Sequence, residues 1–421
     1  MDRYEMIYPN CYTGKEKAAL EQYKQRGGMP TYTIGPITSG AMWLYARCWD
    51  KHNPLFNDEQ YAKGAGYDGI PAIPGFAEPK ARKFLSAELG DPASPNFCYI
   101  GDGYDHEIQY FKNIYAGDTL TVVADKNDYI DITPKSGSTM RGFVLINEAL
   151  MYNQRGEVVA HGIMRWPEFR YKYLKGEKKP NPDSMRPNMS DRYEPPVHIY
   201  TDDDWDYIKD IWNKEYIRGQ KTLYWDDVHI GDEPAWVTEG PITQMDMIRL
   251  HGYDAAGARS YQDHIEKSEG RFLKIEAEGV FYPDNFSHFM SHFGARPQFY
   301  NTTCRNLIIK MLTNWCSDAG FLSRICWRII NNLPPTKQKN HFPIEYARPS
   351  YLLNVPYLRQ NRKYLNVHGN VPDCPIAKGY VTNKFIKDDK HIVQLVCWTE
   401  DLDENISTEC LVEVVLPCRH T

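Results

Sequence analysis

Runs of alternating or continuous apolar residues along the chain predict two groups of β-strands. The first group occupies residues 116–124, 142–152 and 158–166. The second group occupies residues 377–385, 391–398 and 410–416. The sequence Asn153-Gln-Arg-Gly156 between two members of the first group has the composition of a tight turn. Each group therefore predicts an antiparallel sheet.

A repeated tetrapeptide precedes each group of strands. Gly-Pro-Ile-Thr occurs at residues 35–38 and again at 240–243, and apolar residues at helical spacing follow it at 41–46 and 245–250. The chain thus predicts two copies of a helix followed by an antiparallel sheet. This order is typical of the hotdog fold, in which a curved sheet wraps around a long helix. We expect an α+β protein with a double hotdog, two tandem curved antiparallel sheets, each around its central helix.

The stretch between the two copies is poor in apolar residues. Residues 170–194 are rich in Lys, Pro, Asn and Asp, which is typical of an exposed linker. Helical spacing follows at residues 203–216, with acidic residues placed to cap the N-terminus. We therefore predict an N-terminal hotdog over residues 1–170, a linker and connecting helix over 171–220, and a C-terminal hotdog over 221–421.

The composition limits the classes of partner. A chain of 421 residues is longer than one hydrophobic core usually organises, so we expect two domains. Its formal net charge of -6 gives no reason to expect nucleic acid or an acidic membrane surface as a partner. No apolar run is long enough to span a bilayer, and the first residues lack a signal-peptide profile, so we expect a cytoplasmic protein. The 10 cysteines include no Cys-x-x-Cys pair, which argues against a zinc site or a disulfide framework.

Residues 50–76 contain most of a catalytic motif. The stretch from Asn53 to Gly66 is similar to the Asn-Pro-x-His-x-Asp-x-x-x-Ala-x-x-x-Gly signature of the MaoC-like (R)-specific enoyl-CoA hydratases. Phe56 occupies the position of the catalytic histidine, and Lys51 occupies that of the catalytic aspartate, with Asp50 one place early. The resemblance therefore implies that the N-terminal copy is non-catalytic.

Three further passages, residues 216–232, 311–322 and 379–398, extend the resemblance over most of the chain. The chain resembles a fused double-hotdog MaoC-like acyl dehydratase, and its N-terminal half resembles the dehydratase region of type I fatty acid synthases. The resemblance implies a lyase that hydrates an enoyl-CoA, or dehydrates a 3-hydroxyacyl-CoA, reversibly. It implies no cofactor and no metal, since coenzyme A belongs to the substrate.

The second copy offers a candidate for the catalytic pair. The run Asp284-Asn-Phe-Ser-His288 resembles Asp-x-Asn-Pro-x-His, one residue shorter and without the proline. We predict His288 and Asp284 as catalytic, with His292 as a further candidate and Asp254 or Asp263 as alternative aspartates. A turn or helix-cap role would equally explain Asp284, and a structural hydrogen bond would explain a histidine before a core helix. A metal site of His288, His292 and Asp284 lacks a further ligand at a defined spacing.

Five residues are candidates for binding the substrate: Asn301, Thr302, Gly294, Phe56 and Arg305. Asn301 and Thr302 would begin the helix predicted at 301–312, where they either cap it or present N–H groups to a thioester oxygen. Arg305, like Arg324, would meet coenzyme A phosphates or remain solvated. Phe56 either fills the space of the missing pair as core or walls a pocket for a bulky acyl group.

Two other functions are compatible with the same residues. The altered motifs in both copies are also those expected of a non-catalytic acyl-CoA-binding subunit, which would supply half of a tunnel to a partner hotdog protein. A thioesterase is the third candidate. With 30 tyrosines and 10 tryptophans the chain suits an aromatic or alicyclic acyl group, although packing roles explain such residues too. We expect a homodimer, with a hetero-oligomer containing another hotdog protein as the alternative.

Overall fold

The computed structural model describes most of both predicted copies. The described residues are 21, 24–25, 30–79, 96–100, 105–131, 140–172, 199–241, 272–275, 280–283, 301–329, 351–358, 363–364 and 374–420. The predicted helix at 245–250 lies outside them, as does most of the predicted linker. The predicted domain boundaries therefore remain predictions.

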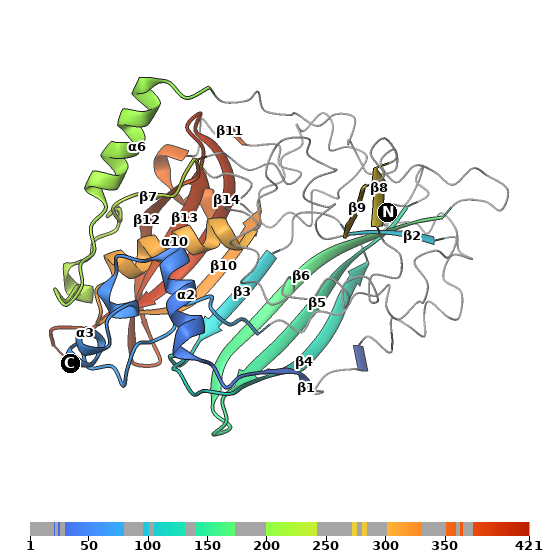
Figure 1. The fold of residues 1–421 in the computed structure, drawn as a ribbon, viewed down its shortest axis with the longest axis horizontal. Helices are drawn as coiled ribbons and strands as arrows, with labels where there is room; N and C mark the ends of the chain where they lie inside the picture. The colour runs from blue at the N-terminus through green and yellow to red at the C-terminus, as the bar shows by residue number, and fades with distance from the viewer. Residues whose placement is uncertain are drawn as a thin grey trace.

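One twelve-stranded sheet runs through both halves of the molecule (Figure 1). Its first-half strands, in spatial order, are β1 (Pro30–Ile34), β4 (Leu120–Asp131), β5 (Met140–Tyr152), β6 (Val158–Lys172) and β3 (Asp105–Tyr110). Its second-half strands continue as β10 (Phe321–Ile329), β14 (Asn405–Val415), β13 (Lys390–Glu400), β12 (Ile376–Lys387) and β7 (Val237–Thr238). Two short strands pair beside this path, β2 (Asn96–Ile100) with β6 and β11 (Lys363–Tyr364) with β14. A separate ribbon consists of β8 (Phe272–Ile275) and β9 (Val280–Pro283).

The strand order repeats between the two halves. We number the five main strands of each half in chain order and leave out β2, β8, β9 and β11. In both halves these strands then lie side by side in the order first, third, fourth, fifth, second. The halves meet where their second strands, β3 and β10, pair antiparallel from Arg324 opposite Gln109 to Arg328 opposite Asp105. The duplication is thereby confirmed, the antiparallel sheets of the two halves join into one sheet at β3 and β10, and the fold is a double hotdog.

The six predicted strands are all present, with changes at their ends. The strand predicted from residue 116 begins at Leu120, because Gly117 has a φ of 92° and the Asp118 N–H donates to the Tyr115 carbonyl in a turn. The predicted turn at Asn153 is confirmed, since the Asn153 side-chain oxygen accepts from the N–H groups of Arg155 and Glu157.

The helices begin at capped positions. Helix α2 (Ser39–Trp49) follows Thr38, whose hydroxyl accepts from the Ala41 N–H. Helix α6 (Asp202–Lys214) starts with a capping box between Thr201 and Asp204. The other helical elements are α3 (Glu59–Gly64), α10 (Asn301–Trp315), and the 3-10 turns η2 (Pro54–Phe56), η3 (Trp225–Asp227), η6 (Tyr351–Asn354) and η7 (Pro356–Leu358).

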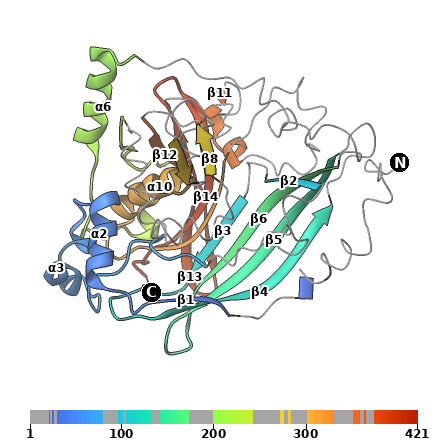
Figure 2. The ribbon, with the colours of Figure 1, turned by 45° about the vertical axis from the view of Figure 1, so that its right-hand side comes forward.

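Helix α10 is the central helix of the second half. It packs on β7, β10, β12, β13 and β14, and α2 of the first half packs beside it (Figures 1 and 2). Every residue from Thr303 to Leu312 is buried. Residues 80–95 of the first half lie outside the described residues. No helix in the described part of the chain is both long and apolar enough to cross a bilayer.

The turn from α10 into β10 leaves no room for a side chain at Gly320. A Cβ there would lie 2.6 Å from the Cys316 carbonyl oxygen and 2.7 Å from the Cys316 Cβ. We therefore expect Gly320→Ala to lower the free energy of unfolding by about 1–3 kcal/mol, because backbone atoms must move to admit the methyl group. Urea denaturation measures this change.

Gly69→Ala is the matched control, because a Cβ at Gly69 would meet nothing within 4 Å. It should leave the denaturation midpoint unchanged or raise it slightly. Equal midpoints for Gly320→Ala and the wild type would contradict the close approach.

Candidate functional site

Four of the predicted site residues, Asp284, His288, His292 and Gly294, lie outside the described residues, as do the alternatives Asp254 and Asp263. Asn301 and Thr302 are the first two residues of α10, as predicted from the sequence. Their roles, and those of the 284–294 residues, remain predictions.

Phe56 is buried at the seam between the two halves, with 4% of its surface exposed. It ends η2 and lines a cavity of about 60 Å³, together with Thr313 and Cys316 of α10 and Phe321 of β10. Phe56 is thus a core residue that also walls a small cavity, and its role in binding an acyl group remains a prediction.

Arg305 is a core residue, with only 1% of its surface exposed. Its guanidinium pairs with the Glu78 carboxylate, donates to the Asn306 side-chain oxygen at 2.8 Å, and lies 5.0 Å from the Trp327 ring centre. The Asn306 amide in turn donates to the Tyr45 hydroxyl at 3.0 Å. The solvated position considered for Arg305 is therefore wrong, and its role in phosphate binding remains a prediction.

Arg324 also pairs with carboxylates. Its Nε donates to Glu107 and its Nη1 to Glu413, each at 2.8 Å. These bonds span the junction between β3, β10 and β14, so Arg324 contributes to the seam between the two halves.

The motif around Asn53 folds as two short capped helices. The Asn53 side-chain oxygen accepts from the Leu55 N–H at 3.1 Å and caps η2, and the Asp58 carboxylate accepts from the Tyr61 N–H at 2.9 Å and caps α3. The Asn53 amide then donates to the Asn314 side-chain oxygen of α10 at 3.3 Å. This bond joins the motif of the first half to the central helix of the second.

Asp50 is a buried carboxylate that sequence reasoning did not select. It is the C-cap of α2, where its N–H donates to the Ala46 carbonyl at 2.8 Å and its carbonyl accepts from the Asn57 amide at 2.9 Å. Only 1% of its surface is exposed, and neither carboxylate oxygen has a hydrogen-bond partner among the described residues. Its displacement by one place from the family pattern was the available signal, but sequence alone could not show its burial.

Charged residues of the second half surround this position. The Lys310 ammonium on α10 pairs with Glu215 at 3.0 Å and with Glu239 at 3.1 Å. Glu215 also accepts from the Asn314 amide at 3.1 Å. A chain of hydrogen bonds therefore leads from Glu239, which is about half exposed, through Lys310, Glu215 and Asn314 to Asn53.

These surroundings change the pKa of the Asp50 carboxyl group and of the Lys310 ammonium group. Burial raises the pKa of Asp50 to about 7, and the Glu215 charge adds to this, while Lys310 opposes it. Asn53 also lowers the pKa of Asp50, without reaching ordinary hydrogen-bond geometry. Burial lowers the pKa of Lys310, but Glu239 and Glu215 outweigh that effect and raise it overall, so Lys310 stays cationic. A carboxyl group that titrates near neutral pH can both accept and return a proton.

A cleft of about 500 Å³ lies next to this network. It is formed by the segment from Glu215 to Val237, the C-terminal turn of α10 and Arg419, and Asn314 forms part of its wall. Each acidic residue that lines it already has a partner: Glu215 with Lys310, Asp227 with Arg419, Asp232 with the His229 N–H, and Glu233 with the Tyr357 hydroxyl.

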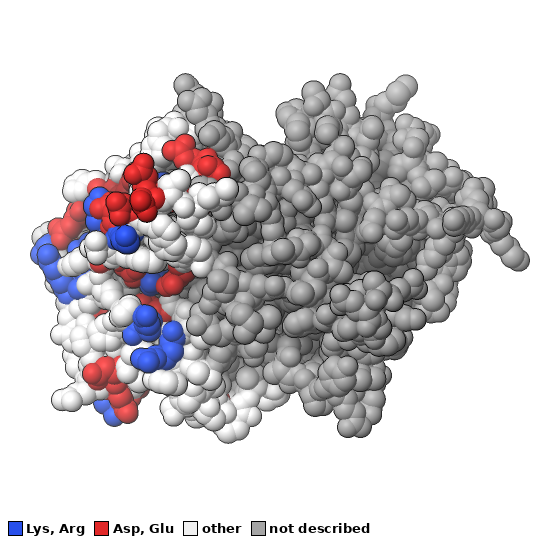
Figure 3. Space-filling view, turned by 45° about the horizontal axis from the view of Figure 1, so that its top comes forward, with Lys and Arg blue, Asp and Glu red and all other residues white. Residues whose placement is uncertain are grey.

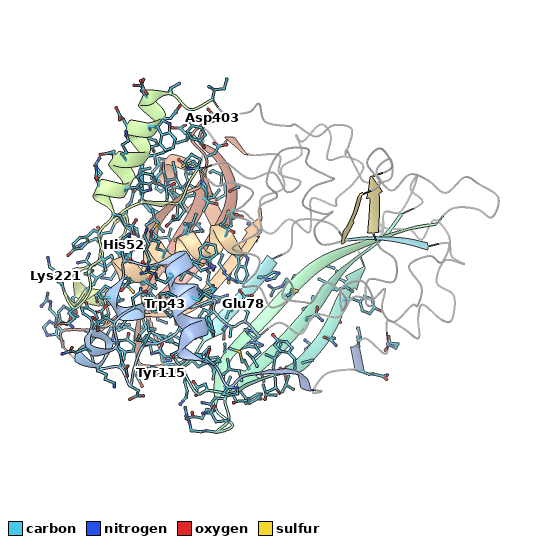
Figure 4. The ribbon with its side chains drawn as sticks, in the orientation of Figure 1. Trp43, His52, Glu78, Tyr115, Lys221 and Asp403 are labelled. Atoms are coloured by element: carbon cyan, nitrogen blue, oxygen red, sulfur yellow. The ribbon has the colours of Figure 1, made fainter. Side chains whose placement is uncertain are left out.

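Lys221, also on the cleft wall, is exposed and forms no ion pair with a described residue. Figure 4 places it at the outer edge of the described part, while Glu78 lies inside beside α10. Acidic and basic side chains are interspersed on the described face that Figure 3 shows.

One group of described residues has the composition of a metal site. Asp125, Glu148 and His161, on β4, β5 and β6, place one ligand atom each within 4.8 Å of one another. His161 lies 3.7 Å from Glu148, which also lies 3.8 Å from the Lys126 ammonium. The contacts of Glu148 with Lys126 and His161 are cross-strand pairs between neighbouring strands.

Comparison with known proteins finds a family match in the first half. Residues 32–162 match the family model of the FAS1-like dehydratase domain region. This part of the chain is similar to the FAS1-like dehydratase region. The predicted resemblance of the N-terminal half is confirmed, and Asp50, Asn53 and Phe56 all lie in the matched stretch.

The comparisons with curated proteins and with solved structures find at most distant similarity. The sequence matches no curated protein. A solved MaoC-like dehydratase is 12% identical over 95% of this chain and 99% of its own, with a TM-score of 0.49. Rv0216 of Mycobacterium tuberculosis, which has a double hotdog fold, is 10% identical over 93% of this chain and 96% of its own, with a TM-score of 0.44. The ChsH1–ChsH2 complex of the same organism is 18% identical over 40% of this chain and 98% of the matched chain, with a TM-score of 0.28.

The raised pKa of Asp50 makes stability depend on pH. An unfolded aspartate titrates near pH 3.9, so between about pH 4 and 7 the folded state holds a proton that the unfolded state has lost. The stabilising contribution is fully present below pH 4 and is lost as the pH rises through about 7. The loss amounts to at most about 4 kcal/mol, at 1.36 kcal/mol for each of roughly three pKa units.

Asp50→Asn removes this titration, so the variant should be about as stable as the wild type at pH 4 and more stable at pH 8.5. Urea denaturation at the two pH values measures the difference. Asp206→Asn, at a carboxylate that is 77% exposed, is the control and should follow the wild type. A wild type and an Asp50→Asn variant with parallel pH dependence would show that Asp50 titrates normally.

Proposed function

We propose that the protein is a lyase that reversibly hydrates an enoyl-CoA to a 3-hydroxyacyl-CoA. The observation that carries the proposal is a buried carboxyl group, Asp50, with a pKa of about 7 inside the region matched by the FAS1-like dehydratase model. Addition or removal of water beside a thioester requires a group that accepts and returns a proton near neutral pH. The reaction needs no cofactor beyond the coenzyme A of the substrate.

We place the coenzyme A part of the substrate in the cleft of about 500 Å³, which is within the usual range for small-molecule sites. The acidic residues of this cleft are already paired with other groups. We therefore take its basic residues Lys221 and Arg218 as candidates for contacts with the coenzyme A phosphates. The Arg218 Nε donates to the Trp315 carbonyl at 2.8 Å, which fixes the guanidinium against α10. The acyl group, which we expect to be bulky and either aromatic or alicyclic, needs more room than the 60 Å³ cavity beside Phe56.

The second candidate is a non-catalytic acyl-CoA-binding subunit of a heteromeric hydratase. One observation favours it: Phe56, a side chain that cannot transfer a proton, occupies the histidine position of the motif and is buried. In this case a partner hotdog protein would supply the catalytic groups.

Turnover by the purified protein alone separates these functions. The protein is incubated with a panel of short, long, aromatic and alicyclic enoyl-CoAs, and the products are identified by chromatography and mass spectrometry. A hydratase converts at least one member of the panel to its 3-hydroxyacyl-CoA. Binding without turnover on any member would identify the non-catalytic subunit. Release of free coenzyme A thiol would identify a thioesterase.

Lys221→Glu tests the placement of the coenzyme A part. It should raise the KM for the best enoyl-CoA about tenfold, equivalent to ~1.4 kcal/mol, by placing a negative charge against the phosphates. The KM for the N-acetylcysteamine thioester of the same acyl group, which has no phosphates, should not change.

Lys387→Glu, at an exposed lysine at the end of β12, is the control for net charge and should leave both KM values unchanged. An equal rise for both thioesters in Lys221→Glu would place the phosphates elsewhere.

A further inference from the structure

We propose that Asp125, Glu148 and His161 form a binding site for a divalent transition metal ion, and that zinc(II) is the ion their chemistry fits. The three side chains place one ligand atom each within 4.8 Å of one another. They come from the neighbouring strands β4, β5 and β6 of the first half. None of them lines either of the two described cavities, so this site is additional to the one in the proposed function.

Glu148 and His161 lie on the face of the sheet that points away from the core. Glu148 stands between the buried residues Asn147 and Ala149, and His161 is likewise flanked by buried residues along β6. Because side chains alternate between the two faces of a strand, both point to the outer face. His161 pairs in register with Leu150, two places from Glu148, so the two side chains are diagonal neighbours. The His161 Nε2 lies 3.7 Å from the Glu148 carboxylate.

A β-bulge brings the second carboxylate to the same face. The register between β4 and β5 shifts between Ala124 and Lys126, which leaves Asp125 as an extra residue on β4. Asp125 and Lys126 are both exposed, and the next residue, Asn127, is buried. In a regular strand two consecutive side chains would take opposite faces. The bulge therefore places Asp125 beside Lys126 on the outer face, where Lys126 stands opposite Glu148 in register.

One imidazole and two carboxylates are a ligand set that zinc accepts. Zinc binds histidine nitrogen and carboxylate oxygen at about 2.0–2.2 Å, and two such atoms in a tetrahedral site lie roughly 3.4 Å apart. His161 and Glu148, at 3.7 Å, need only a small movement to reach this spacing. Asp125 is exposed, so its carboxylate can turn to complete the set. Water would take the fourth position, and the imidazole disfavours magnesium and calcium, which prefer oxygen ligands.

Lys126 is the cation that competes for these carboxylates. Its ammonium lies 3.8 Å from Glu148, and its side chain is 61% exposed. An exposed ion pair of this kind contributes little, so a divalent ion can displace the lysine into solvent. The Glu148 and His161 side chains are only 22% and 19% exposed, so the surrounding strands hold them in place. Two of the three ligands are therefore positioned before an ion binds.

Titration of the full-length protein with Co²⁺ tests the proposal, after dialysis against a chelator. Visible absorption spectra follow the binding. We expect one equivalent to bind without a thiolate charge-transfer band, which distinguishes this site from any of the 10 cysteines. Zn²⁺ should displace the Co²⁺, whereas a hundredfold excess of Mg²⁺ should not.

His161→Ala should weaken Co²⁺ binding at least about tenfold, because even the loss of a group that only supports a metal ligand costs 10–100-fold in affinity. Asp125→Asn should have an effect of the same size, and as an exposed position it does not endanger folding. His229→Ala is the matched control: this histidine is 78% exposed and lies 3.9 Å from Asp232, without a third ligand among the described residues. It should keep the wild-type dissociation constant.

Lys126→Gln should change the affinity in the opposite direction. Removal of the competing ammonium should tighten Co²⁺ binding about two- to fivefold, which is the range that an exposed ion pair is worth. A purely structural role of these side chains predicts no such gain.

Three results would overturn the proposal. Equal dissociation constants for the wild type, His161→Ala and Asp125→Asn would show an adventitious ion only. A thiolate band in the Co²⁺ spectrum would place the ion on cysteines. Displacement of Co²⁺ by Mg²⁺ would show an unspecific acidic patch. Because each readout is metal binding, the result does not depend on whether the protein hydrates an enoyl-CoA.

Discussion

The burial of α10 on all sides is the constraint on which the seam between the two halves depends. The helix is enclosed by the strands of its own half and by α2 of the other. Its apolar residues Leu307, Ile308, Ile309 and Leu312 are fully buried, so the two halves share one hydrophobic core around it. Burial of these side chains contributes roughly 1.5–3 kcal/mol each before conformational entropy is counted.

The same helix carries polar and charged residues into that core, and each needs a partner there. Arg305 pairs with Glu78, the Asn306 amide donates to Tyr45, and Asn314 accepts from Asn53, and these three partners lie in the first half. Lys310 pairs with Glu215 and Glu239, which lie in the second half. Removal of one partner would leave a buried group unpaired, at a cost of roughly 1–3 kcal/mol or more. These pairs fix how the halves fit together, beyond what the apolar contacts require.

Asp50 differs from these residues because it is enclosed by the same core without receiving a hydrogen-bond partner among the described residues. Its desolvation is the main reason that its pKa lies about three units above that of an exposed aspartate. A neutral residue at this position would therefore stabilise the folded protein at neutral and higher pH. The buried Phe56 blocks the position at which a histidine would stand.

The sequence by itself determined the duplication, the six long strands and the helices α2, α6 and α10, because periodicity, turns and caps are set by neighbours in the chain. It also identified the dehydratase resemblance around Asn53. Only the tertiary structure decided that Arg305 is enclosed and paired with Glu78 and that Asp50 lies beside Lys310 of a helix far along the chain. Burial and the pKa of a carboxyl group depend on contacts between distant segments, which no local pattern encodes.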